Sequence, residues 1–282
     1  MNEGSAHYTP KSSGKTKNLW SFAIACTKTI VQDFTGVYAE QPFMQGLRGR
    51  DATCYIDCAD IPGTDCYCDD EAIEMIRRRI ADAGISDAHG IHFFDNGNYH
   101  YMSKIWTDMI QKPFSLVVFD HHPDMQEPRF GNILSCGGWV KKVLEENKFV
   151  QSVTLIGVAD HLAEEILPHD KVMIIRESEI STHTSHIPHL TSSYPLYISI
   201  DKDALSTDYA ATNWDQGSLS LEHMKAIIEA LAQGRKIIGM DICGERARDF
   251  AGDERHTVQE ADTLNDRTNR ELVEFLTPLA LS

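Results

Sequence analysis

The chain has 282 residues, of which 42% are hydrophobic and 24% are charged, and both values are ordinary for a soluble protein with one large core. Its 42 acidic and 26 basic residues give a net charge of −16, which argues against non-specific nucleic-acid binding. This charge suits capture of a metal or a cationic substrate, although solubility explains it equally well. No apolar run approaches the length of a membrane span, and the N-terminus lacks the apolar segment of a secretory signal, so a cytoplasmic protein without membrane contact is expected.

Strand-like apolar runs alternate with helix-like segments along the chain. We expect a flexible polar tail over residues 1–17 and a single catalytic domain over 18–282. The expected strands are 19–27, 90–96, 115–122, 153–160, 171–178, 196–203 and 236–243, and the expected helices are 69–83, 101–111, 137–148, 161–167, 220–232 and 259–279. This alternation is typical of βαβ units and predicts a three-layer α/β/α domain with a mostly parallel central sheet.

Four of the seven cysteines cluster in the segment CYIDCADIPGTDCYC, as Cys54, Cys58, Cys66 and Cys68. Reduced thiols are expected in a cytosolic protein. The spacing matches none of the usual paired zinc motifs, so structural or loop cysteines are the favoured interpretation. A metal site and a redox or substrate-facing role remain open alternatives.

Acidic residues follow several of the expected strands. Asp120 follows VVF, Asp201 follows ISI, and Asp241 follows IGM. Sites in open α/β sheets form outside the carboxyl ends of the strands. Carboxylates gathered at one such edge repel one another unless a cation lies between them, so this pattern predicts a metal site.

The spacing of these residues defines a candidate ligand set. Asp120, His122 and Asp124 share one face if the chain stays extended through the intervening proline. Asp201 and Asp203 form a second such pair, and His100 follows a third apolar run. Oxygen ligands with some nitrogen favour Mn²⁺, and six ligands are enough for two ions that together activate a water molecule.

The ligand set resembles that of the arginase–agmatinase (ureohydrolase) family, whose fold is shared by histone-deacetylase-like amidohydrolases. The motifs DHHPD and SIDKD stand in the family's order about 80 residues apart, and GNYH replaces its first metal-binding loop. The likeness spans roughly residues 90–275. It implies an arginase-like fold, frequent homo-oligomers and two Mn²⁺ bound by six residues: His100, Asp120, His122, Asp124, Asp201 and Asp203. Asp-His-His also marks a phosphoesterase family, but its upstream and downstream motifs are absent.

The resemblance also implies the residues that act on a substrate. Asp124 and Glu245 are the candidate catalytic residues, and Glu245 is expected to pair with a guanidinium. The family pattern Asp-Ile-x-Glu is one residue longer here, so Glu245 would reach the site through a bulge at Gly244, and Asp241 is the alternative.

Two loops depart from the family pattern. YAATNWDQG replaces a glycine- and threonine-rich stretch and makes Asn213, Trp214 and Asp215 candidate substrate-binding residues, with packing of the loop as an equal alternative. Asp160 at the end of the run 153–160 is a further candidate. Ser135 and Cys136 stand where a proton-shuttling histidine is expected. The proton donor is therefore unassigned, with substitutes among His161, His183, His186 and His189.

Three functions follow from these motifs. The favoured one is a dinuclear manganese hydrolase that releases urea from a guanidino group, either in a small cationic molecule or in an arginine-containing peptide. The second is an amide or formimino hydrolase on the same fold. The third is a metal-binding scaffold without catalysis.

Overall fold

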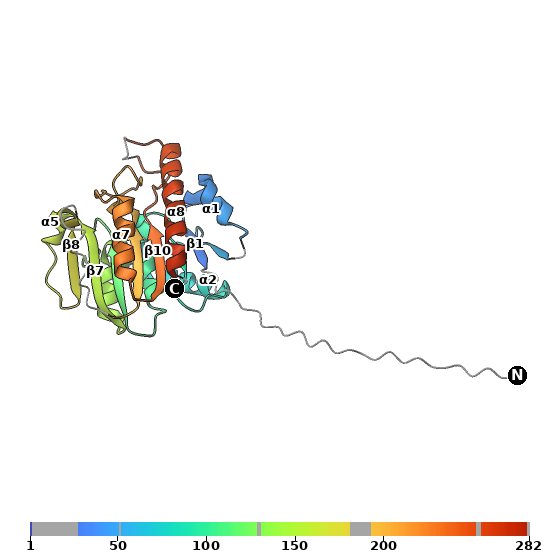
Figure 1. Ribbon diagram of the computed structural model, residues 1–282, viewed down its shortest axis with the longest axis horizontal. Helices are drawn as coiled ribbons and strands as arrows, with labels where there is room; N and C mark the ends of the chain where they lie inside the picture. The colour runs from blue at the N-terminus through green and yellow to red at the C-terminus, as the bar shows by residue number, and fades with distance from the viewer. Residues whose placement is uncertain (2–27, 51, 129–130, 181–192, 252–254, 281–282) are drawn as a thin grey trace.

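The centre of the molecule is a sheet of eight parallel strands in the order β2-β1-β4-β10-β9-β5-β7-β8 (Figure 1). The structure is a computed structural model that describes residues 1, 28–50, 52–128, 131–180, 193–251 and 255–280. The strands are β1 Thr29–Asp33, β2 Thr53–Asp57, β4 Ile91–Phe93, β5 Phe114–Phe119, β7 Val150–Val158, β8 Val172–Arg176, β9 Leu196–Asp201 and β10 Ile237–Cys243. A two-stranded antiparallel ribbon, β3 Tyr67–Cys68 and β6 Leu134–Ser135, lies apart from this sheet.

Helices cover both faces of the sheet. They are α1 Pro42–Leu47, α2 Asp70–Asp82, α3 Met102–Thr107, α4 Trp139–Glu146, α5 Asp160–Ala163, α6 Glu177–Ile180, α7 Leu221–Ala232 and α8 Val258–Ala280. Short 3-10 turns are η1 Val37–Glu40, η2 Gly97–Tyr99, η3 Cys136–Gly138 and η4 Lys202–Ala204. Helices α7 and α8 cross the front of the sheet in Figure 1.

Each face of the sheet has its own hydrophobic core. Successive strand residues point to opposite faces, so Val117 of β5 packs with α1, α7 and α8, whereas Leu116 and Val118 pack with α2, α3 and α4. Both sets are fully buried, which explains why these strands are continuous apolar runs in the sequence. The predicted three-layer α/β/α fold is confirmed.

The edges of the sheet differ from the sequence prediction. Strands β1 and β2 were missed, because buried Gln32 and Asp33 interrupt the apolar pattern of β1 and because β2 is half-buried and contains Cys54. The expected strand at 19–27 and the expected tail at 1–17 lie outside the described residues, except for residue 1. Helices α3, α4 and α5 are shorter than predicted.

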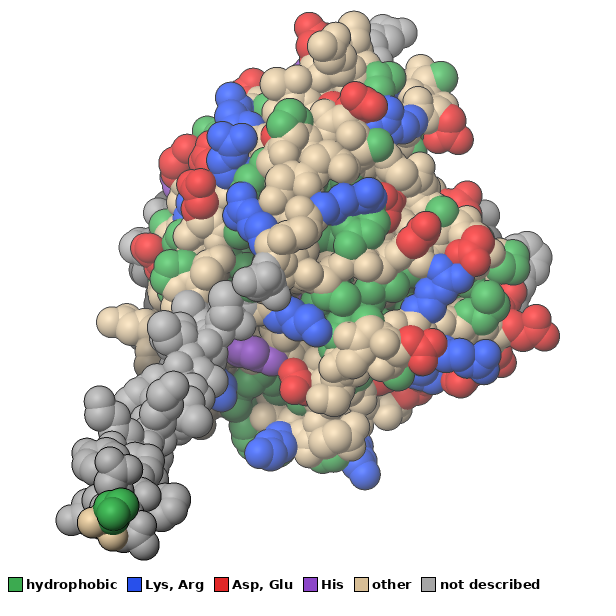
Figure 2. Space-filling model, turned by 90° about the vertical axis from the view of Figure 1, so that its right-hand side faces the viewer, with side chains coloured by type: hydrophobic (Ala, Val, Ile, Leu, Met, Phe, Trp, Pro, Cys, Tyr) green, Lys and Arg blue, Asp and Glu red, His purple; other side chains and the backbone are tan. Residues whose placement is uncertain are grey.

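One face of the molecule carries charged and apolar side chains together. Figure 2 shows basic and acidic side chains interspersed over one face of the molecule, with apolar side chains between them. Within the described ranges, no helix combines the length and the apolar character that crossing a bilayer requires.

Candidate metal centre

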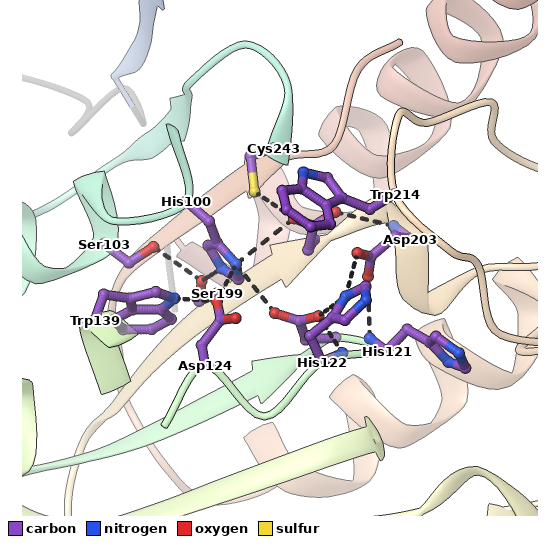
Figure 3. A network of polar contacts seen from close by, with 12 residues as sticks. His100, Ser103, His121, His122, Asp124, Trp139, Ser199, Asp203, Trp214 and Cys243 are labelled. Atoms are coloured by element: carbon purple, nitrogen blue, oxygen red, sulfur yellow. Dashed lines mark hydrogen bonds and ion pairs between the residues drawn. The ribbon is translucent and has the colours of Figure 1, made fainter. Parts of the chain in front are cut away.

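The candidate ligands lie at the carboxyl ends of three strands, β4, β9 and β5, and β10 lies between β4 and β9. His100 follows β4 through the turn η2, Asp120 directly follows β5, and Asp201 is the last residue of β9. Figure 3 shows the side chains of His100, Asp124, His122 and Asp203 turned toward one another. The sheet therefore brings together residues that are up to about a hundred positions apart in the sequence.

The loop after β5 is not extended, contrary to the expectation from its i, i+2, i+4 spacing. The strand ends at Phe119, and Asp124 has a left-handed backbone with φ of 49°. The backbone N–H of His122 donates to Asp120 Oδ1 at 2.6 Å, which closes a turn. The three side chains converge because the loop curls around them, rather than because they share one face of a strand.

The turn after β9 places the second pair of carboxylates. The N–H of Asp203 donates to Asp201 Oδ1 at 3.0 Å and starts the 3-10 turn η4. Gly244 at the end of β10 packs against this turn, and a Cβ there would lie 2.3 Å from Asp201 Oδ1. Because its φ is 87°, glycine is the residue that fits this close approach.

His100 is the centre of one ligand group. Its Nδ1 lies 3.1 Å from Asp120 Oδ2, 3.0 Å from Asp124 Oδ2 and 3.6 Å from Asp201 Oδ2. All four side chains are almost fully buried. His100, Asp120 and Asp124 form a group whose ligand atoms lie close enough to hold one metal ion.

His122 belongs to a second group that shares Asp120 with the first. Its Nδ1 lies 2.9 Å from Asp203 Oδ2 and 3.5 Å from Asp120 Oδ1. Asp120, His122 and Asp203 also meet the spacing for a single ion. The two oxygens of Asp120 thus face different groups, so an ion held by either group would have Asp120 among its ligands.

Residues behind the ligands fix their orientation. Ser199 Oγ donates to Asp241 Oδ1 at 2.6 Å and lies 2.9 Å from His100 Nε2. The Ser199 oxygen therefore accepts a hydrogen bond from Nε2–H, which leaves Nδ1 directed at the carboxylates. On the other side, the indole of Trp139 donates to Asp124 Oδ2 at 2.6 Å.

The charge state of the buried acids points to cation binding. Burial, followed by the charge of Asp203, raises the pKa of Asp201 to about 7. Burial and the charge of Asp120 raise the pKa of Asp203 to about 6. Although burial alone would lower the pKa of His122, hydrogen bonds to Asp120 and Asp203 raise it to about 12. Protons on the imidazoles thus compensate the carboxylates, and divalent cations fit the same donor set.

The six residues border a pocket of about 350 Å³. Its remaining wall contains no Lys or Arg from the described part of the chain and is formed by Cys66, Tyr67, Gly97, Gln126, Glu127, Pro128, Ser135, Cys136, Gly137 and Trp214. Trp214, 41% exposed, packs edge-on against His122 with ring centres 5.7 Å apart. Asn213 does not line the pocket but binds Asn98, as Trp214 does, and Asp215 is exposed outside it.

Glu245 is not brought to this pocket. Its carboxylate is buried behind the ligand turn, where it accepts hydrogen bonds from Lys202 at 2.5 Å, Asn269 at 2.7 Å and Gln41 at 2.8 Å. Asp241, the alternative, is bound to Ser199 behind His100 and does not line the pocket.

Other candidates lie elsewhere as well. Asp160 binds Ser178 and does not line the pocket, and His161 is exposed on α5. His183, His186 and His189 lie outside the described residues. Where the structure describes the chain, the proton donor sought in the sequence therefore has no histidine candidate other than the ligands themselves.

Sequence reasoning missed several residues of the site. Trp139 has the appearance of a core residue, and nothing in its local pattern indicates a hydrogen bond to a ligand. Ser199 belongs to the motif SIDKD, but no role was predicted for it. Cys66 and Cys136 line the pocket, whereas Cys58 and Cys68 are buried in the core. The sequence did place Cys136 near the site, because Ser135 and Cys136 stand where the family's proton-shuttling histidine is expected.

An eight-stranded parallel sheet with acidic and imidazole ligands at its carboxyl edge defines a three-layer α/β protein with a candidate dinuclear metal centre. The sequence profile of the Arginase family matches residues 49–247. An uncharacterised protein of Thermotoga maritima is 32% identical over 216 residues, which are 76% of this chain and 78% of that protein. The chain therefore belongs to the Arginase family.

Solved structures share the fold at low sequence identity. Proclavaminate amidino hydrolase from Streptomyces clavuligerus superposes with a TM-score of 0.62 at 15% identity, over 91% of this chain and 93% of that one. A triple mutant of an arginase-like protein from T. brucei, bound with Mn²⁺, has a TM-score of 0.58 at 17% identity, over 91% and 92% of the two chains.

Proposed function

We propose that this protein is a dinuclear manganese hydrolase that cleaves a C–N bond of a guanidino group and releases urea. The observation that supports it most is the pair of ligand groups that share Asp120 at the bottom of one pocket. Membership of the Arginase family supports a hydrolase, and the oxygen-rich donor set with two imidazoles suits Mn²⁺. The amidino hydrolase with the same fold acts, by its name, on a related chemical group.

The residues have distinct roles in this reaction. When bound, two divalent ions supply an acidified water as nucleophile and the positive charge that stabilises the tetrahedral transition state. Asp124, held by the indole of Trp139, accepts the proton of the attacking water and returns it to the leaving amine. Ser199 and Asp241 keep the His100 ring in a fixed orientation.

The substrate is proposed to be cationic, as a free small molecule or an arginine side chain of a peptide. Glu127 is the one described carboxylate of the pocket wall outside the six ligands. It lies at the rim, where it pairs with Lys141. The partly exposed ring of Trp214 also lines the pocket and suits a flat cation. These two residues, rather than Glu245, are the proposed contacts to the substrate.

One observation favours a second candidate, an amide or formimino hydrolase. At the end of β10, Cys243 pairs with Asp201, Gly244 packs against Asp201, and the following Glu245 is engaged by Lys202. The end of β10, which was expected to supply an acid that binds a guanidinium, thus presents no acid to the pocket. A neutral acyl group needs no such acid.

A metal count combined with product analysis tests both candidates. The protein is stripped with a chelator, reloaded with Mn²⁺ and assayed for metal content. It is then incubated with arginine, agmatine, guanidinobutyrate, guanidinopropionate and an arginine-containing peptide, and separately with formimino and acetylated amines. We expect about two manganese ions per chain and urea from one guanidino compound. Product from the formimino or acetylated compounds alone would transfer the assignment to the second candidate.

Glu127→Gln provides a matched control for substrate recognition. Because this change removes a charge without touching a ligand, manganese content should be unchanged and KM for a cationic substrate should rise roughly tenfold. An unchanged KM would exclude Glu127 as a contact.

A further inference from the structure

Two cysteines lie opposite each other at the end of the β3–β6 ribbon. In this antiparallel pair Tyr67 faces Ser135 and Cys68 faces Leu134. Extending the register by one residue places Cys66 opposite Cys136, and the N–H of Cys136 donates to the carbonyl oxygen of Cys66 at 2.9 Å. Cys66 has a left-handed backbone with φ of 57° and Cys136 begins η3, so both lie just beyond the ribbon, and this hydrogen bond holds their backbones side by side. A disulfide joins Cα atoms about 4.4–6.8 Å apart, and backbones held in this way suit one.

The side chains of the two cysteines meet in the wall of the metal-ligand pocket. Both line it, and each thiol shifts the pKa of the other. The hydrogen bond from Cys136 lowers the pKa of Cys66, and the same contact, together with burial, raises the pKa of Cys136. A lowered pKa favours the thiolate of Cys66, which is the form of the sulfur that reacts with oxidants.

The other described thiols lack this combination. Burial raises the pKa of Cys58 and that of Cys68 to about 12, and neither residue lines the pocket. Cys243 is fully buried and donates to Asp201. Cys54 is half-buried on β2 and lies outside the pocket wall.

The ribbon is physically connected to the ligand loop. The N–H of Gln126 donates to the carbonyl of Gly137 at 2.9 Å, and the N–H of Val140 donates to the carbonyl of Asp124 at 3.1 Å. Gly137 and Val140, the partners in these two bonds, follow Cys136 within four residues. A covalent link at Cys136 therefore restrains the segment on which Asp124 rests.

We propose that Cys66 and Cys136 are a redox-active pair that forms a reversible disulfide in the wall of the pocket, with a peroxide as oxidant. The Cys66 thiolate attacks a peroxide oxygen, which gives a sulfenic acid and, after protonation, one water. The Cys136 sulfur then displaces the sulfenic hydroxyl as a second water and forms the S–S bond. Two thiols and one hydrogen peroxide thus yield one disulfide and two waters, and a dithiol reductant reverses the change. The pair makes pocket access dependent on redox state.

Peroxide titration of the full-length, manganese-loaded protein tests this. After complete reduction and desalting, hydrogen peroxide is added, remaining thiols are alkylated, and peptides are mapped without reductant. We expect a peptide pair joined through Cys66 and Cys136, a mass loss of two hydrogens, and a fall from seven alkylated cysteines to five. Dithiothreitol should restore all of them. The midpoint of thermal unfolding should rise on oxidation, since an unstrained bridge restricts the unfolded chain.

Two variants provide controls that do not touch the metal ligands. Cys54→Ser should leave the cross-link unchanged. Cys136→Ser should abolish it and leave Cys66 as a sulfenic acid that dimedone traps. Oxidation of any other cysteine before this pair, or a wild-type protein that yields no joined peptide, would overturn the proposal. The wild-type map decides the matter even if Cys136→Ser does not fold.

Discussion

Trp139 shows how a single core residue controls a ligand. Its ring is fully buried and lies 4.9 Å from the ring of His100, while its indole N–H holds Asp124. Asp124 has a left-handed backbone, which costs free energy in a non-glycine residue and needs surrounding contacts to maintain it. The hydrogen bond from Trp139 is one of those contacts.

We predict that Trp139→Phe lowers the affinity for Mn²⁺ by about 10–100-fold, because the ligand carboxylate loses the partner that orients it. Competition with a fluorescent chelator measures the change. Trp106→Phe is the matched control, since the Trp106 indole is also buried but donates to Gln32, away from the ligands. If both variants weaken manganese binding equally, a general loss of packing rather than the Asp124 contact is responsible.

At the scale of residues, the sequence predicted which positions gather but not how they are held. Polar residues that follow buried strands are conspicuous, so the ligand candidates could be identified before the fold was known. Trp139 was not identified, because an aromatic residue at the start of a helix has the same pattern whether its N–H meets a ligand or not. The curl at Asp124 was missed because spacing alone does not reveal a left-handed residue.

At the scale of elements, Lys202 and Glu245 link three of them. Lys202 begins η4 after β9, Glu245 follows β10, and both bind Asn269 of α8. Both charged side chains are at most 1% exposed. A buried ion pair of this kind is costly to break from one side, because the remaining charge has no partner.

We predict that Lys202→Met or Glu245→Leu alone lowers the free energy of unfolding by about 3–5 kcal/mol. The double variant should lose much less, since neither charge is then left unpaired. Urea denaturation of the manganese-loaded wild type, single variants and double variant measures the free energies of unfolding. Metal content is checked in each, because Lys202 lies between two ligand candidates. Additive losses in the double variant would contradict this coupling.

The Lys202–Glu245 pair also explains why the sequence could not decide whether Glu245 reaches the pocket. One additional residue, Gly244, separates Glu245 from the end of β10, and a shift of one position reverses the side to which a side chain points. Glu245 consequently faces α8 and Lys202 instead of the pocket. The parallel sheet itself was predictable, since buried strands appear as continuous apolar runs, whereas the half-buried strand β2 did not stand out.

At the scale of the whole molecule, buried charge links stability to pH. Burial raises the pKa of Asp201 to about 7 and that of Asp203 to about 6, from 3.8 in the unfolded chain. Burial alone would lower the pKa of His122, but hydrogen bonds to carboxylates outweigh burial and raise this pKa to about 12, above its ordinary 6.5. In each case the folded protein retains protons that the unfolded chain has already released.

The metal-free protein should therefore lose stability as pH rises from 5 to 8. Over this range the folded state binds more protons than the unfolded state, so the slope of unfolding free energy against pH is negative. The carboxyl groups contribute between pH 3.8 and about 7, and His122 contributes above 6.5. Thermal unfolding of chelator-treated protein at several pH values measures the slope. Mn²⁺ should reduce or reverse it, because bound cations replace the protons and bind more tightly as pH rises. In the metal-free protein, Asp203→Asn should make the unfolding free energy depend less on pH. If the thermal unfolding midpoint of the metal-free wild type rises with pH instead, these carboxylates do not govern its stability.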